Sequence, residues 1–244
     1  MNRRICLSLF FILLICFSLM SQTDKIRIAL VSQVDAGFAL LKCKENPDFL
    51  RYRTEYTFVQ SEIFDFDIKE KWLEFFRMNL DSDKYEIRFE AMPEEVKDNY
   101  LFSIYKGTNG FGHASSKLKK WFSELYENNG YDIVIMLFKA ILDSRYSAIF
   151  ELNQYPPCGV IQNENWIYSL YNINVYQSRD GKILFRKKSG GYNDYLRTLK
   201  KVNLSKLSFN EITEEDLEPA IDEIVMMNSD VGRKICKRII AYSN

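Results

Sequence analysis

The chain has 244 residues, of which 47% are hydrophobic and 15% aromatic, with 33 basic and 33 acidic side chains. This apolar content is ample for one sizeable core and excludes an intrinsically disordered chain. A net charge of zero provides no basic field for nucleic acid, so we expect no nucleic-acid partner.

The first residues have the layout of a secretory signal peptide. Segment 2–4 is short and basic, an apolar run follows from Ile5 to Met20, and small polar residues end it. The run is shorter than the roughly 20 residues of a spanning helix, so we predict cleavage of residues 1–21 and an exported chain with no transmembrane helix. An uncleaved anchor and lipidation at Cys16 are the alternatives, but Ile15 is bulky where lipidation requires a small residue.

Export would place the chain in an oxidising compartment, where cysteines can pair. Removal of the signal peptide leaves Cys43, Cys158 and Cys236, an odd number at wide spacings. One disulfide with one free thiol fits this count, but three buried apolar cysteines are favoured. The sequence has no CxxC motif or Cys/His cluster, so we expect no metal site and no cofactor.

The mature chain, residues 22–244, is predicted to be a single α/β domain. Its first half alternates between the hydrophobic periods of strands and helices. The expected elements are a strand at 25–31, a helix at 67–80, a strand at 85–91, a helix at 117–127 and a strand at 130–140. This alternation favours a parallel, Rossmann-like core with helices against the sheet. Segment 35–65 has no clean period, and we expect an excursion there with a short helix or strand.

The central strand of this core is predicted from the apolar run at 131–138. A short, almost unbroken apolar run between polar segments is typical of a strand buried on both faces. Segment 85–91 instead alternates apolar and charged residues, which predicts a strand with one wet face.

The second half of the chain predicts antiparallel pairing. Residues 166–177 are expected to form one long strand, and Asp180-Gly181 before the next apolar run is a strong hairpin signal. Segment 192–202 is a helix candidate.

Two amphipathic helices are expected to close the chain. Pro219 fits the first turn of one, and Ser229 can cap the other. The expected fold is therefore an α/β sandwich of two or three layers. Its mixed sheet has a parallel Rossmann-like core and an antiparallel hairpin extension, followed by C-terminal helices.

A sequence motif at the hairpin, together with the order of the elements, resembles a known group of proteins. The motif consists of Ile173-Asn174-Val175-Tyr176 followed by Asp180-Gly181-Lys182-Ile183-Leu184-Phe185. It looks like that of bacterial envelope proteins of the TolB amino-terminal, LpoB and CsgG type. The resemblance implies a non-enzymatic periplasmic or outer-membrane-associated domain that binds another envelope protein.

Three residues are weak catalytic candidates for a crevice at the strand carboxyl ends, where open α/β sheets bind ligands. Asp35 follows the first strand and Asp143 follows the central one, so the two could form a carboxylate pair. His113, the only histidine, titrates near neutrality and could accept a proton from Ser115 or Ser116. Carboxylates that cap turns and a histidine without chemistry are the favoured interpretation.

The loop around His113 could instead bind an anion, because backbone N–H groups at a helix start carry partial positive charge. The candidates are Gly110, Gly112, Ser115 and Ser116. Their spacing matches neither the dinucleotide fingerprint nor a Walker loop, so a surface loop with a serine cap is favoured.

The favoured function is a periplasmic or envelope-associated binding or assembly protein without a catalytic centre. An exported hydrolase that uses the crevice at the strand ends is one alternative, and a small-ligand-binding protein is another. The aromatic residues Trp166, Tyr168, Tyr171 and Tyr176 fall on both faces of one expected strand. Core packing is favoured for them, with an exposed contact surface as the alternative.

Overall fold

The computed structural model describes residues 25–34, 36–46, 55–97, 116–140, 152–186 and 196–243. They form two five-stranded mixed sheets. In spatial order, the first sheet contains β4 (Tyr85–Phe89), β1 (Ile26–Ser32), β5 (Ile133–Lys139), β8 (Tyr171–Gln177) and β9 (Ile183–Arg186). The second sheet contains β10 (Leu196–Thr198), β7 (Trp166–Ser169), β6 (Cys158–Ile161), β2 (Phe38–Asn46) and β3 (Glu55–Phe64).

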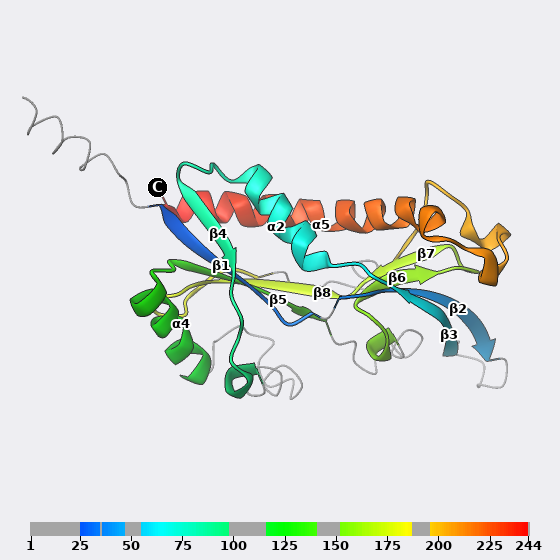
Figure 1. Cartoon of the computed structure of the whole chain (residues 1–244), viewed down its shortest axis with the longest axis horizontal. Helices are drawn as coiled ribbons and strands as arrows, with labels where there is room; N and C mark the ends of the chain where they lie inside the picture. Colours follow the sequence, from blue (N-terminus) through cyan, green and yellow to red (C-terminus); the bar gives the residue numbers. More distant parts are fainter. Residues whose placement is uncertain are drawn as a thin grey trace, which may run out of the picture.

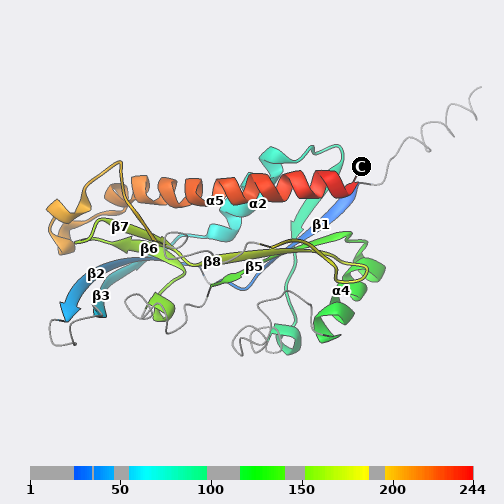
Figure 2. The same ribbon diagram turned by 180° about the vertical axis from the view of Figure 1, so that it is seen from behind.

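The helices cover both faces of the first sheet. They are α2 (Ile68–Asn79), α4 (Ser116–Asn129) and α5 (Glu214–Ser243), with short 3-10 turns η3 (Leu204–Lys206) and η4 (Phe209–Glu211) before α5. Figure 1 shows the two sheets end to end beneath α5, with α2 beside α5 and α4 on the opposite side. Figure 2 shows the same layers from behind, with the carboxyl end of α5 near the start of β1. Helices and mixed sheets together confirm the predicted α/β class.

The first sheet has the predicted parallel core and antiparallel extension. β1 runs parallel to both β4 and β5, whereas β8 is antiparallel to β5 and β9 is antiparallel to β8. β5 occupies the centre, and its residues 133–138 are all buried. The prediction of a central strand with two covered faces is therefore confirmed.

The two faces of β5 contribute to different clusters of the core. Ile133, Ile135 and Leu137 belong to a large cluster beneath α2 and α5, which also includes residues of the second sheet. Val134 and Met136 belong to a smaller cluster beneath α4. Alternate residues of a strand point to opposite faces, so an unbroken apolar run supplies both clusters.

Local turn chemistry agrees with the sequence at three positions. The carboxylate of Asp67 accepts a hydrogen bond from the Lys69 amide (2.9 Å) and caps α2, at the start of the helix predicted for 67–80. Gly181 has φ +68° in the β8–β9 hairpin, where the Lys182 amide donates to the Asp180 carboxylate. Gly130 also has φ +68°. It directly follows the last residue of α4 and lies three residues before β5, in a conformation that glycine adopts readily.

Segment 35–65 is more regular than predicted. Its described residues form β2 and β3, a pair of antiparallel strands in the second sheet. Two features hide their period in the sequence. The buried stretch from Phe38 to Leu41 is apolar on both faces, and the register of the pair shifts between Leu40 and Leu41.

The prediction of one long strand at 166–177 is wrong. The strand breaks at Leu170 into β7 and β8, which belong to different sheets. The Leu170 amide donates to the Pro157 carbonyl (2.7 Å), and its own carbonyl accepts from the Ala140 amide (2.9 Å). These bonds link the two sheets where the strand changes partners. In segment 192–202, β10 replaces the predicted helix.

The prediction of two C-terminal helices is also wrong, because α5 is one helix of 30 residues. Its buried stripe continues in phase through the expected boundary at Ser229, whose hydroxyl donates to the Met226 carbonyl. The side-chain amide of Asn228 donates to the Ile224 carbonyl (2.8 Å) and to the Ser169 hydroxyl (3.2 Å). These contacts hold the helix against β7. Pro219 lies in the second turn of α5, beyond the predicted first turn.

Candidate functional site

Six of the seven predicted site residues lie outside the described residues. They are Asp35, Gly110, Gly112, His113, Ser115 and Asp143. The seventh, Ser116, is the exposed first residue of α4. The catalytic and anion-binding hypotheses therefore stay predictions.

The aromatic residues of β7 and β8 belong to the core. Tyr168, Tyr171 and Tyr176 are each no more than 2% exposed. The contact-surface alternative is therefore wrong for these three side chains, whereas Trp166 is half-buried. Burial holds the pKa of Tyr168 and Tyr171 well above that of a free tyrosine.

The cysteines are buried thiols, which confirms the favoured interpretation of Cys43, Cys158 and Cys236. Burial raises the pKa of Cys158 to about 12 and that of Cys236 to about 11. Since the thiolate is the nucleophilic form, neither of these two thiols is activated for covalent chemistry near neutral pH.

The outer edge of β4 is the described surface best suited to contact another molecule. β4 ends its sheet, and no other described strand pairs with its outer side. The carbonyl of Lys84 and the amide of Glu90 both bond to β1, at 2.9 and 3.0 Å. The even-numbered residues of this stretch thus direct their backbone groups inward. The odd-numbered residues Tyr85, Ile87 and Phe89 therefore direct theirs outward.

Among the described residues, most of these outward groups have no hydrogen-bond partner. The Tyr85 amide donates to the carbonyl of Asp81 in the preceding turn (2.9 Å). No hydrogen bond within the described part of the chain engages the Tyr85 carbonyl, the Phe89 amide or either backbone group of Ile87. An extended edge with open donors and acceptors is a template for a further strand.

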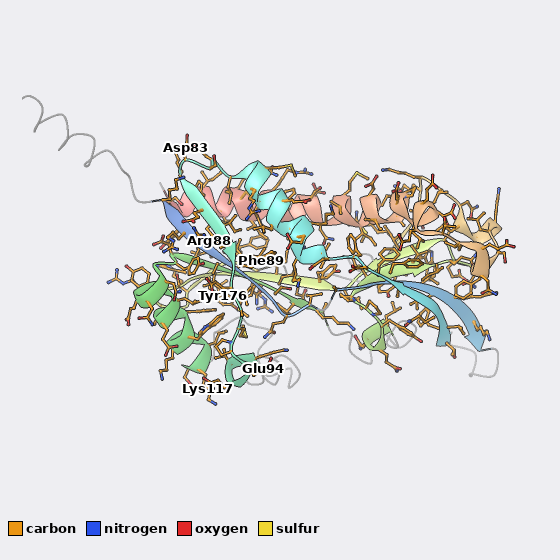
Figure 3. The ribbon with its side chains drawn as sticks, in the orientation of Figure 1. Asp83, Arg88, Phe89, Glu94, Lys117 and Tyr176 are labelled. Atoms are coloured by element: carbon orange, nitrogen blue, oxygen red, sulfur yellow. The ribbon has the colours of Figure 1, made fainter. Side chains whose placement is uncertain are left out.

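An open groove of about 670 Å³ follows this edge beside the end of α2. Its lining residues are Lys25, Phe76, Arg77, Leu80, Ser82, Tyr85, Glu86, Ile87 and Arg88. Both side-chain faces of β4 contribute to the lining. Figure 3 shows Asp83 in the turn before β4, and Arg88 and Phe89 on the strand itself.

The polar face of β4 carries a fixed set of charges. Glu86 forms ion pairs with Arg27 on β1 (3.4 Å) and with Arg88 on its own strand. The Arg27 guanidinium lies over the Tyr131 ring, 5.1 Å from its centroid, and the Tyr131 hydroxyl donates to Glu90. These contacts engage Glu86, Arg88 and Glu90 of the edge.

No family model, curated protein or solved structure matches this chain. Across the described ranges, no three His, Cys, Asp or Glu side chains are grouped so that they could hold a metal ion. None of the described helices combines the length and apolarity needed to cross a bilayer.

The sequence contained part of the signal for this site. The alternation at 85–91 correctly predicted a strand with one wet face. Its charges, with Lys84, Glu86, Arg88 and Glu90 at every second position, were visible as well. The position of β4 at the end of the sheet was not visible, because strand order depends on long-range pairing.

Proposed function

We propose that this chain is an exported, envelope-associated binding or assembly protein without catalytic activity, and that the outer edge of β4 is its contact surface. The observation that carries the proposal is the row of outward backbone groups on β4, beside a groove of about 670 Å³. Strand addition uses such an edge. Main-chain hydrogen bonds then provide affinity, and the alternate side chains provide specificity.

The envelope location is supported by the sequence. The predicted signal peptide ends at residue 21, and β1 begins at Ile26. Amino-terminal sequencing of the chain recovered from an exported fraction tests this part. We expect a terminus close to residue 22, and an intact terminus in the cytoplasmic fraction alone would contradict export.

Site-specific photocrosslinking tests the contact surface. A photoreactive amino acid replaces Phe89 on β4, and a matched variant carries it in place of Lys119, which is exposed on α4. We expect a discrete cross-linked protein adduct from position 89 and none from position 119. The absence of an adduct at position 89 would contradict the proposal.

A hydrolase screen tests the non-enzymatic part. We expect no turnover across ester, peptide and glycoside substrates. Activity that disappears in a chain with Asp35→Asn, His113→Ala and Asp143→Asn together would contradict the proposal in favour of an exported hydrolase.

A further inference from the structure

We infer that the strand added to the β4 edge is β4 of a second copy of this chain, paired antiparallel about a two-fold axis at Ile87. This inference rests on the proposed function, because it takes the same edge as the contact surface. A two-fold axis brings the same surface of both copies together, so the strand must complement itself when it is read in reverse. Segment 84–90 meets that condition.

The backbone groups of β4 fit this axis. Directly opposed residues of an antiparallel pair alternate between hydrogen-bonded and non-hydrogen-bonded pairs. Ile87 opposite Ile87 of the second copy is a hydrogen-bonded pair, since both backbone groups of this residue point outward. The Phe89 amide then meets the open Tyr85 carbonyl of the second copy. By symmetry each of these bonds forms twice.

The charges of β4 complement each other in the same register. Glu86 lies opposite Arg88 of the second copy, and Lys84 lies opposite Glu90. Both are non-hydrogen-bonded pairs, in which opposed side chains approach most closely. Opposite charges at such positions stabilise strand pairing. Every charged residue of the stretch thus faces its opposite.

The charges also exclude the neighbouring registers. The parity of the outward groups allows shifts by two residues only. One such shift places Glu86 opposite Glu86 and Lys84 opposite Arg88. The reverse shift places Arg88 opposite Arg88 and Glu86 opposite Glu90. Like charges directly opposite each other destabilise a pair, so the register centred on Ile87 is favoured.

The apolar face supports the same pairing. Tyr85 lies opposite Phe89 of the second copy, and Ile87 lies opposite itself. Phe89 is 37% exposed, a large aromatic area that the second copy would cover. Aromatic pairs across strands are among the favourable ones. The product is one continuous sheet through two copies, which removes both exposed β4 edges.

Charge reversal in solution tests the inference. The full chain is expressed in a bacterium and purified with or without residues 1–21, according to whether that host cleaves them. Its mass is then measured by size exclusion with light scattering. We expect a concentration-dependent dimer for the wild type. Glu86→Arg and Arg88→Glu should each weaken the dimer at least roughly tenfold, because each reversal creates two like-charge pairs. Lys119→Glu, a reversal on α4, should leave the dimer unchanged.

Recombining the two reversals provides the sharpest readout. In an equimolar mixture of the two single variants, arginine at positions 86 and 88 of one copy faces glutamate at both positions of the other. We expect a heterodimer in this mixture, although each variant alone is monomeric. The double variant E86R/R88E restores opposite charges within one sequence and should dimerise like the wild type.

A variant that removes one outward backbone donor tests whether the dimer can be lost while the chain stays folded. The Phe89 amide points outward, so Phe89→Pro leaves the bonds between β4 and β1 in place while it removes an outward donor. We expect a folded monomer by circular dichroism and light scattering. A variant that unfolds is replaced by N-methylation of residue 89 in a semisynthetic chain, with the same expected result.

Several outcomes would overturn the inference. These are a wild type that stays monomeric at its highest soluble concentration, a dimer that Arg88→Glu does not weaken, and single variants that do not combine. The photocrosslinking result then separates the two proposals. An adduct between position 89 and a different protein retains the proposed function, whereas a monomer without any adduct contradicts both.

Discussion

β5 and β4 belong to the same sheet with only β1 between them, yet their surroundings differ. In β5, residues 133–138 are at most 6% exposed, whereas Arg88 and Phe89 of β4 face solvent. β5 has a strand on each side and helices over both faces; β4 has one described neighbouring strand. An unbroken apolar run thus indicates a strand that is covered on both faces, and an alternating run indicates a strand that is covered on one face. Neither pattern reports whether the edge of the strand is paired.

The largest expected effect comes from a charge in β5. Ile135→Asp would bury a carboxylate at a position that is 0% exposed, with no cation opposite it on β1 or β8. We expect a loss of more than about 4 kcal/mol in the free energy of unfolding, measured by urea titration. Phe89→Asp on β4 is the matched control, with a loss of about 1 kcal/mol or less. Similar losses in both variants would contradict the difference between the strands.

The next prediction concerns α4, which covers the second face of β5. Phe122 of α4 is fully buried, and its ring centroid lies 5.0 Å from that of Tyr176 on β8. We expect Phe122→Ala to lower the free energy of unfolding by about 3–5 kcal/mol, because it leaves a cavity above the strand. Lys119→Ala on the exposed side of α4 should change it by less than about 0.5 kcal/mol. A small loss in the free energy of unfolding for Phe122→Ala would show that α4 does not cover this face of β5.

A smaller effect involves the contact that joins the two strands at their ends. Tyr131 precedes β5, and its hydroxyl donates to Glu90, which follows β4. Burial, and next the hydrogen bond to Glu90, raise the pKa of Tyr131 to about 12 from 10.0. The folded state favours the neutral phenol, so this stability is present below pH 10 and is lost as the pH rises to about 12.

The comparison with Tyr131→Phe isolates this contribution. We expect the advantage of the wild type in the free energy of unfolding to be constant below pH 10 and to shrink above it. Denaturant titration across this range measures the difference, and Tyr126→Phe, at an exposed position of α4, is the control. An advantage that does not change with pH would contradict the raised pKa.

The smallest expected effect is a difference in hydrogen exchange between single backbone amides, without a change in the free energy of unfolding. In the monomeric Arg88→Glu variant, we expect the amides of Ile87 and Phe89 to exchange with solvent faster than those of positions 88 and 90. Amides of residues 133–138 should all exchange slowly. Hydrogen exchange followed by NMR measures this pattern. Equal protection along β4 in the monomer would mean that another part of the chain covers the edge.

Much of the fold could be predicted because its signals are local. Asp67 caps α2 through an amide two residues away, and the β8–β9 hairpin follows from a glycine at a position with positive φ. The candidate site was harder to predict. The alternation at 85–91 predicts a strand with one wet face. The residues with candidate chemistry in the sequence, Asp35, His113 and Asp143, lie outside the described residues.

By itself, the sequence determined most elements of the first half of the chain, their buried faces and the self-complementary charges of β4. These properties follow from the side-chain period and from contacts between near neighbours. Only the tertiary structure decided which strand lies beside which. It divided the expected strand at Leu170 between two sheets, continued α5 through Ser229 and left β4 at the end of its sheet. Hydrophobic periodicity indicates which faces of a strand or helix are buried. The backbone N–H and C=O groups are alike from residue to residue, so they do not specify which strand lies beside which.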